Sequence, residues 1–130
     1  MKKAFYVYNS FTDQAFCGNP AGVVPDADDL STEQMQLIAR QLNLVETVFI
    51  LKDTDPGVAC RLRYFMPEGE LPIAGHPTIA AWAYLKDSQV SDNQNFKQTT
   101  GAGPIQVSLQ NDKIYATQKT PTIRDRKSVV

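Results

Sequence analysis

The sequence has few of the residues that bind metals or carry redox chemistry. It holds one histidine, His76, and two cysteines, Cys17 and Cys60, without a Cys-x-x-Cys pair or a cysteine–histidine cluster. A structural zinc site needs about four such ligands at close spacing, so we expect no metal site. Nothing near Cys17 in the sequence would stabilise a thiolate. We therefore interpret Cys17 as a small buried hydrophobe and expect both thiols to be reduced.

The sequence also lacks an excess of positive charge. Its 13 lysines and arginines face 14 aspartates and glutamates, which gives a net charge of -1. Binding to nucleic acid or to an anionic membrane surface needs a basic excess that neutralises phosphates. The one basic cluster, Arg124, Arg126 and Lys127, alternates with Asp125 and predicts a solvated tail. We therefore expect no nucleic acid and no membrane among its partners.

Long hydrophobic runs are absent as well. The apolar stretch near the start is too short for the core of a signal peptide or for a membrane span, so we expect a cytoplasmic protein. The chain has 130 residues, 42% of them hydrophobic, which suits a single compact domain. We assign residues 1–120 to a single barrel domain and residues 121–130 to a polar tail.

What the sequence does contain is one segment, residues 77–85, that is apolar on nearly every face. Pro77 suits the first turn of a helix, where a missing N–H costs nothing. A helix without a polar face is buried on all sides. In a small domain such a helix requires a sheet wrapped around it.

A second, different helix is predicted over residues 32–42. Ser31 and Gln34 have the form of a capping box at its start. Its apolar residues recur at helical spacing along one face: Met35, Ile38, Ala39 and Leu42. We expect this amphipathic helix to lie on the outside of the domain.

The remaining apolar or alternating runs predict strands separated by turn residues. They are residues 4–8, 45–51, 58–66, 96–100, 105–109 and 114–117. Residues 21–24 form a shorter apolar run that is not assigned to a strand. Gly18-Asn19-Pro20, just before the shorter run, predicts a sharp bend or bulge. In 58–66, arginines alternate with apolar residues, as in a strand with one wet face. The predicted fold is α+β: an antiparallel barrel-like sheet of about six to eight strands around a central buried helix, plus one outer amphipathic helix.

Glu46 is a candidate general acid/base. It stands at the start of the strand 45–51, among Leu44, Val48 and Phe49, where its carboxylate would face a partly dry pocket. The alternative is an ordinary charge at a sheet edge that points to water. The pattern alone leaves both interpretations open.

His76 stands between Gly75 and Pro77, at the amino end of the predicted buried helix. Unpaired N–H groups and the helix dipole make such an end an anion site suited to a carboxylate. A histidine there could bind substrate or relay a proton, and the alternative is a capping histidine with a packing role. Gly75 would let a ligand approach the backbone closely, or it only makes the turn.

Three further polar residues are weaker candidates. Glu68 and Glu70 flank Gly69 in the loop before the buried helix, and paired carboxylates suggest acid/base chemistry. Two loop glutamates are, however, usually solvated. Asn19 is interpreted as an amide that fixes its loop or contacts a substrate.

Taken in order, these segments resemble the phenazine-biosynthesis isomerase (PhzF-like) family, which shares the diaminopimelate epimerase fold. Each motif is weak alone, but the ordered set covers nearly the whole chain. The matching residues are Phe11-Thr12, Gly18-Asn19-Pro20-Ala21-Gly22-Val23-Val24, Leu30-Ser31, Gln34-Met35-Gln36, Ile38-Ala39-Arg40, Asn43-Leu44-Val45-Glu46-Thr47-Val48-Phe49, Arg61-Leu62-Arg63-Tyr64-Phe65, Pro67 and Glu70-Leu71-Pro72-Ile73-Ala74-Gly75-His76-Pro77-Thr78.

The resemblance implies roles for the candidates. Glu46 matches the family's general acid/base, which shifts a proton on a small cyclic amino-acid-like or carboxylate substrate, and we assign His76 as catalytic beside it. Related epimerases carry a catalytic cysteine where Ala74 stands here, which disfavours a two-thiol racemase. No metal or organic cofactor is implied. We expect four residues to bind substrate: Asn19, Gly75, Pro77 and Thr78.

The chain differs from members of this family in length. Members of the family have two similar barrel halves with the active site in the cleft between them, and this chain matches only the N-terminal half. A lone half would expose a sheet edge, which invites pairing with another chain. We therefore expect a homodimer in which two copies imitate the two halves. The expected function is that of a proton-shifting isomerase, and the alternative is a non-catalytic half-domain or truncated isomerase that only binds a small acid or a partner chain.

Overall fold

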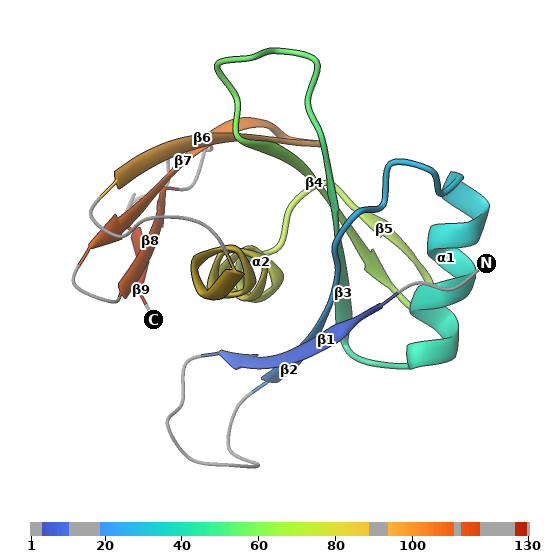
Figure 1. The fold of residues 1–130 in the computed structure, drawn as a ribbon. Helices are drawn as coiled ribbons and strands as arrows, with labels where there is room; N and C mark the ends of the chain where they lie inside the picture. Colours follow the sequence, from blue (N-terminus) through green and yellow to red (C-terminus); the bar gives the residue numbers. More distant parts are fainter. Residues whose placement is uncertain (1–3, 11–18, 89–93, 111–112, 118–126, 130) are drawn as a thin grey trace.

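A computed structural model describes residues 4–10, 19–88, 94–110, 113–117 and 127–129. Figure 1 shows its helices and strands. In chain order they are β1 (Tyr6–Ser10), β2 (Asn19–Val24), α1 (Thr32–Leu42), β3 (Glu46–Leu51), β4 (Cys60–Met66), β5 (Gly69–Leu71), α2 (Gly75–Ser88), β6 (Gln94–Thr100), β7 (Gly103–Gln110), β8 (Lys113–Thr117) and β9 (Lys127–Val129). Within this described part of the chain, neither helix is long and apolar enough to cross a membrane.

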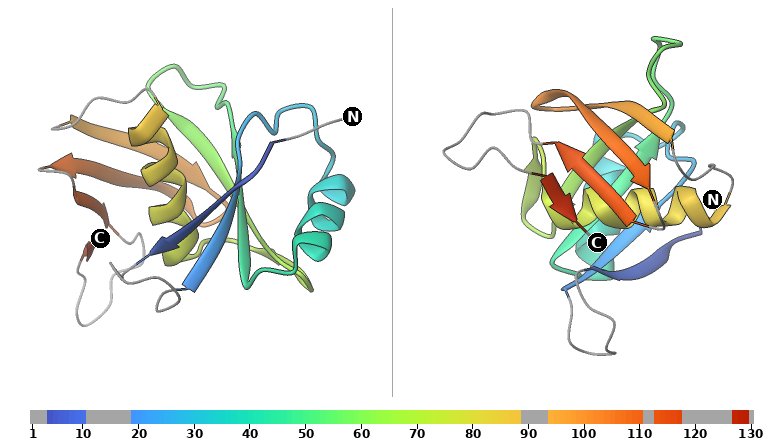
Figure 2. Two further views of the ribbon diagram at one scale, coloured as in Figure 1. Left: turned by 60° about the horizontal axis from the view of Figure 1, so that its bottom comes forward. Right: turned by 90° about the vertical axis from the view of Figure 1, so that its left-hand side faces the viewer.

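The strands form one sheet that curls around α2. Its order is β1-β2-β3-β4-β6-β7-β8-β9, and β5 pairs with β4 outside this path. Figure 1 looks along α2 and shows the strands arranged around it, and the views in Figure 2 show α1 lying on the outer side of the sheet. The predicted α+β fold, a barrel-like sheet around a central helix with one outer helix, is confirmed.

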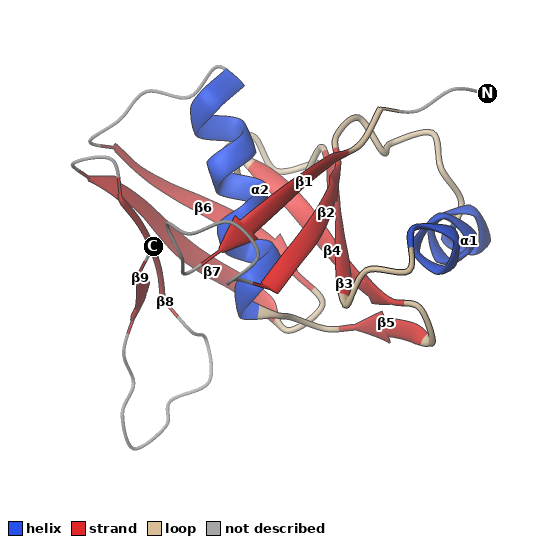
Figure 3. Ribbon diagram, turned by 90° about the horizontal axis from the view of Figure 1, so that it is seen from below, coloured by secondary structure: helices blue, strands red, loops and turns tan. Residues whose placement is uncertain are grey.

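Two pairings in the sheet differ from the antiparallel arrangement that the sequence predicted. β2 lies parallel to β3 and β4 lies parallel to β6, whereas the other pairings among the described strands are antiparallel. Parallel neighbours need a long crossover connection, usually a helix. Here α1 lies between β2 and β3 in the chain, and α2 lies between β5 and β6. The two crossovers lie on opposite faces of the sheet (Figure 3).

The outer helix α1 begins and ends where the sequence predicts. Oγ of Ser31 accepts a hydrogen bond from the Gln34 N–H at 3.1 Å, and Oε1 of Gln34 accepts one from the Ser31 N–H at 2.8 Å. The predicted capping box is therefore confirmed. Asn43 ends the helix in the left-handed conformation, with φ of 54°, which asparagine tolerates better than most residues.

The apolar face of α1 explains one error in the sequence analysis. Met35 and Ala39 pack against Phe49 and Phe65 on the outer face of the sheet. Phe65 alternates with Arg61 and Arg63 and would therefore lie on the wet face predicted for residues 58–66, but it is buried because α1 covers the end of β4. The wet face is limited to the start of that strand, where Arg61 is exposed.

The inner helix α2 forms the centre of the main core. Residues 77–82 are all buried, and Trp82 is the largest side chain without exposed surface. They pack against inward-facing residues of the surrounding strands, among them Ala21, Val23, Val48, Ile50, Leu62, Tyr64, Val107 and Leu109. The prediction of a wholly buried helix is confirmed for this half of α2, whereas residues 83–86 are only partly buried.

Three strands lie outside the predicted set: β2, β5 and β9. Asn19 and Pro20, where a bend was predicted, already belong to β2 and pair with Ser10 and Asn9, whereas Gly18 lies outside the described residues. β9 falls within the residues assigned to a polar tail and pairs with β8. The boundary at residue 120 stays a prediction.

Candidate functional site

Glu46 begins β3 on the face of the sheet that looks toward α2. Side chains alternate between the two faces of a strand. Val48 and Ile50, which share this alternation with Glu46, belong to the core around α2, whereas Phe49 packs on the opposite face under α1. Glu46 is therefore an inner-face residue, and its side chain is half-buried. This is the location that the acid/base hypothesis requires, and the role itself stays a prediction.

The amino end of α2 lies at the same end of the half-barrel as Glu46. Tyr64 pairs with Val48 across β3 and β4, and its hydroxyl lies 2.6 Å from Oγ1 of Thr78 in the first turn of α2. Val48 follows Glu46 by two residues on one strand face, which is roughly 7 Å of strand. His76, which precedes Thr78 by two residues, is half-buried. The fold thus gathers the two predicted catalytic residues at one end of the half-barrel.

A buried chain of hydrogen bonds fixes this helix end to the sheet. Nε1 of Trp82 donates to Oε1 of Gln98, and Nε2 of Gln98 donates to the Tyr64 hydroxyl at 3.0 Å. Oγ1 of Thr78 donates to the Ala74 carbonyl at 2.7 Å. Because an indole can only donate and the Thr78 proton is committed to Ala74, Tyr64 must donate to Thr78. Each of these hydrogen bonds therefore has a defined donor, and together they link the first turn of α2 to β4 and β6.

Burial also favours the protonated form of the Tyr64 hydroxyl, which its hydrogen bond to Thr78 requires. Desolvation raises the pKa of the Tyr64 hydroxyl to about 12, against the lowering effect of its bonds with Thr78 and Gln98. The hydroxyl therefore keeps its proton at physiological pH and acts as a neutral donor.

Gly75 leaves open space at the amino end of α2. A Cβ atom built on this residue would meet no other atom within 4 Å, and the residue is exposed. Packing inside the domain therefore does not require a glycine at this position. The open space is consistent with a ligand that approaches the backbone here.

The other predicted substrate-binding residues are placed less favourably. Pro77 and Thr78 are buried, and the Thr78 hydroxyl already bonds to Tyr64 and Ala74. The backbone of Asn19 begins β2, two residues before Ala21, which pairs with Glu46. The side chain of Asn19, like all of Cys17, lies outside the described residues.

The two loop glutamates do not form an acid/base pair. Nε and Nη2 of Arg63 each donate to Glu70 at 2.8 Å, in a two-point ion pair that raises the pKa of the guanidinium. Glu68 is exposed in the turn between β4 and β5. Glu70 is thus engaged in holding β5 against β4, because Arg63 lies on β4.

Cys60 is a buried, unreactive thiol. It is 4% exposed, and desolvation raises its pKa to about 12, with a further contribution from Asp53. A thiol in this state is protonated at neutral pH and is a poor nucleophile. Among the described residues no group of histidine, cysteine, aspartate and glutamate could hold a metal ion.

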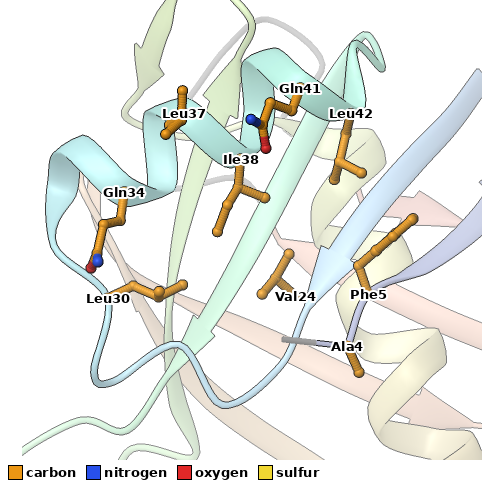
Figure 4. Close-up of a pocket in the computed structure, with 9 residues that line it drawn as sticks. All are labelled: Ala4, Phe5, Val24, Leu30, Gln34, Leu37, Ile38, Gln41 and Leu42. Atoms are coloured by element: carbon orange, nitrogen blue, oxygen red, sulfur yellow. The ribbon is translucent and has the colours of Figure 1, made fainter. Parts of the chain in front are cut away.

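An apolar groove lies on the other side of the sheet. It has a volume of about 350 Å³ between α1, β2 and the segment before β1, and Figure 4 shows the side chains that line it. Its only polar side chains are Gln34 and Gln41. The lining of this groove offers no ionisable group for proton transfer, so it is not a candidate for the predicted acid/base site.

Two residues that hold the first turn of α2, Tyr64 and Gln98, were not among the residues predicted for the site. Tyr64 could have been found, because it alternates with Cys60 and Leu62 and must share their buried face. Gln98 has no such signal, since it lies in a polar strand and is fully buried only because Trp82 and Tyr64 both bond to it.

These observations define the class of domain: a curled mixed sheet around one buried helix, with Glu46 on its inner face and His76 on the helix toward the same end of the half-barrel. Residues 8–128 match the family described as phenazine biosynthesis-like protein. The chain belongs to this family.

Two curated relatives of this chain are named as isomerases. An uncharacterized isomerase of Pasteurella multocida is 44% identical over 104 residues, 80% of this chain and 36% of the relative. The trans-2,3-dihydro-3-hydroxyanthranilate isomerase of Pseudomonas aeruginosa is 37% identical over 112 residues, 86% of this chain and 40% of the relative. The chain therefore spans less than half the length of these relatives.

A solved structure gives the same result. The crystal structure of a phenazine biosynthesis protein of the PhzF family from Enterococcus faecalis superimposes with a TM-score of 0.80 at 29% identity. The match covers 95% of this chain and 48% of that protein. The resemblance to the PhzF-like family stated from the sequence motifs is thereby confirmed.

Proposed function

We propose that this domain serves a proton-shifting isomerase in which Glu46 is the general acid/base. The position of Glu46 on the inner face, at the end of the barrel where α2 begins, carries the proposal. In the proposed step the Glu46 carboxylate removes a proton from a carbon beside a carboxylate or enamine. The electron pair left behind shifts along the conjugated system, and Glu46 returns the proton at another carbon.

The proposed substrate is a small cyclic amino-acid-like acid. The amino end of a helix favours an anion through its dipole and its N–H groups, and the space beside Gly75 would admit one. His76 would bind the substrate or relay the proton from the same helix end. The reaction transfers only a proton and therefore needs no redox cofactor.

The proposal includes a second copy of the chain. The domain covers less than half of its relatives, and a half-barrel alone leaves the substrate with a wall on one side only. A homodimer would supply the opposite wall from an identical surface. The cytoplasm remains the predicted location.

Deuterium uptake from solvent tests the proposed chemistry. The chain is incubated in deuterated water with trans-2,3-dihydro-3-hydroxyanthranilate, the compound in the name of the P. aeruginosa relative, and with simple cyclic amino acids. Mass spectrometry then follows exchange at carbon. We expect uptake that Glu46→Gln lowers by about 100-fold or more, while Glu33→Gln, an exposed glutamate of α1, leaves it unchanged.

The non-catalytic alternative gives a different result in the same experiment. A half-domain that only binds a small acid would show no exchange with any candidate, and Glu46→Gln would bind the acid as tightly as the parent chain. Exchange that persists in Glu46→Gln would contradict the assignment of the general acid/base.

A further inference from the structure

A second cavity lies at the end of the half-barrel opposite to Glu46 and His76. It has a volume of about 380 Å³ and is formed by the segment after β2, the end of β3, the start of β4, the carboxyl-terminal half of α2, and β6. Cavities of about 300–1,000 Å³ are the usual size of small-molecule sites. The acid/base chemistry proposed above makes no use of this cavity.

Aromatic rings form much of the wall of this cavity. The rings of Trp82 and Phe96 lie 5.1 Å apart and are tilted by 33°, and Tyr84 lines the cavity beside them. Their apolar neighbours are Pro25, Ile50, Leu51, Ala59, Cys60 and Leu85. A wall of this kind suits a flat apolar group, and the faces of aromatic rings also attract cations.

The charged residues of the cavity favour a positive ligand. Asp26 and Asp28 supply two carboxylates, and Lys52 supplies the one ammonium group among the lining residues. The Cys60 thiol stays neutral because burial keeps it protonated. Leu85 belongs to the last turn of α2, where the helix dipole is negative. The dipole of α2 therefore favours a cation at this end and an anion at the other.

We propose that this cavity is a second binding site, for a small amine that carries an aromatic or similarly flat apolar group. The ammonium group would lie at the carboxylates of Asp26 and Asp28, and the apolar group would lie against Phe96 and Tyr84, with the buried Trp82 ring beside Phe96. The site is separate from the acid/base site, so its occupancy does not depend on Glu46.

The test uses three probes that share a phenyl ring and a three-carbon chain: 3-phenylpropylamine, 3-phenylpropanol and 3-phenylpropionate. Trp82 is the only tryptophan of the sequence and lies against Phe96, so its fluorescence responds to a ligand bound at Phe96. We expect the amine to change the emission and to bind about tenfold more tightly than the carboxylate, with the alcohol between them. Added salt should weaken the amine more than the alcohol.

Matched variants assign the preference to the two carboxylates. Asp26→Asn and Asp28→Asn keep an oxygen acceptor and remove the charge, and asparagine also tolerates the left-handed φ of 56° at position 26. The double variant should abolish the preference for the amine, and Ala59→Arg, at an exposed position of the rim, should weaken the amine by a similar factor. Glu33→Gln and Glu46→Gln should leave the affinity unchanged.

Three results would overturn the proposal. One is the absence of any Trp82 response to the amine up to millimolar concentration. Another is carboxylate binding as tight as amine binding. The last is a preference for the amine that survives in the Asp26→Asn, Asp28→Asn double variant. Glu46→Gln is used both in the amine titration and in the deuterium experiment. Either experiment can fail while the other succeeds, so the two proposals are tested separately.

Discussion

The hydroxyl of Tyr64 lies 2.6 Å from Oγ1 of Thr78, inside the core and between the sheet and the first turn of α2. The same hydroxyl accepts a hydrogen bond from Gln98, so it joins β4, β6 and α2. This oxygen atom therefore adds polar links between the sheet and the amino end of the helix to the apolar packing of α2.

Replacing Tyr64 by phenylalanine should destabilise the domain by about 1–3 kcal/mol. The ring would remain, but Gln98 and Thr78 would each lose a buried partner. Urea unfolding measures the change, and Tyr6→Phe is the matched control because the Tyr6 ring stacks on Tyr84 at 5.0 Å and the residue is 43% exposed. Equal unfolding midpoints for the two variants would show that the buried chain of hydrogen bonds adds nothing to stability.

Gly75→Ala should separate folding from ligand binding. The new methyl group meets no atom within 4 Å, and alanine loses less backbone entropy than glycine, so stability should stay equal or rise by about 0.5–1 kcal/mol. Binding of a substrate that approaches this backbone should weaken. Calorimetry of unfolding and a ligand titration test the two effects, and unchanged binding would remove Gly75 from the site.

Gly101→Ala is the contrasting variant. Its Cβ would lie 3.0 Å from Cα and 3.2 Å from the carbonyl oxygen of Pro72, which are backbone atoms that cannot move aside easily. We expect a clear loss of stability, in the range of about 1–3 kcal/mol for overpacking. A Gly101→Ala protein as stable as the parent would mean that the segment before α2 is free to shift.

Stability should fall at alkaline pH. Burial raises the pKa of Cys60 from 9.0, and of Tyr8 and Tyr64 from 10.0, in each case to about 12. The folded state then binds more protons than the unfolded state, so the stabilisation is complete below pH 9 and is lost as the pH rises to 12. Urea midpoints measured from neutral to alkaline pH test this, and Cys60→Ala should show the shallower decline.

The exposed residues of β1 make a homodimer testable. β1 stands at one end of the strand order, and Val7 of β1 and Phe5 just before it are each 49% exposed. Free strand edges with apolar side chains favour pairing with another chain. We expect a dimer by light scattering and a monomer for Val7→Lys. A parent chain that stays monomeric at high micromolar concentration would contradict the predicted homodimer.

The elements that the sequence predicted best are those whose signals are local. The capping box at Ser31 and the apolar stripe of residues 32–42 define α1 to the residue, and Pro77 with its apolar followers indicated a buried helix. Phe65 was misplaced because its burial depends on α1, which lies far from it in the sequence. The parallel pairing of β2 with β3 is likewise a property of the crossover and leaves no mark on either strand.

The same distinction between local signals and long-range contacts applies to the candidate site. The residue types of Glu46 and His76 singled them out, but their common end of the barrel follows from the pairing of Val48 with Tyr64 and from the bond between Tyr64 and Thr78. No periodicity in the sequence contains that information. Asn19 and Cys17 stay predictions, because the described residues do not include their side chains.

Both ends of α2 form hydrogen-bonded links with residues that are distant in the sequence. These links affect when the domain can fold during translation. The Tyr8 hydroxyl donates to Asp87, which is 79 residues away. The Tyr64 hydroxyl accepts a hydrogen bond from Gln98 of β6. A nascent chain can form the bond of Tyr8 with Asp87 only after α2 has been translated, and the bond of Tyr64 with Gln98 only after β6 has been translated. The outer core under α1 is complete once β4 has been made, whereas the inner core needs α2 and the later strands. We therefore expect the half-barrel to close late in synthesis.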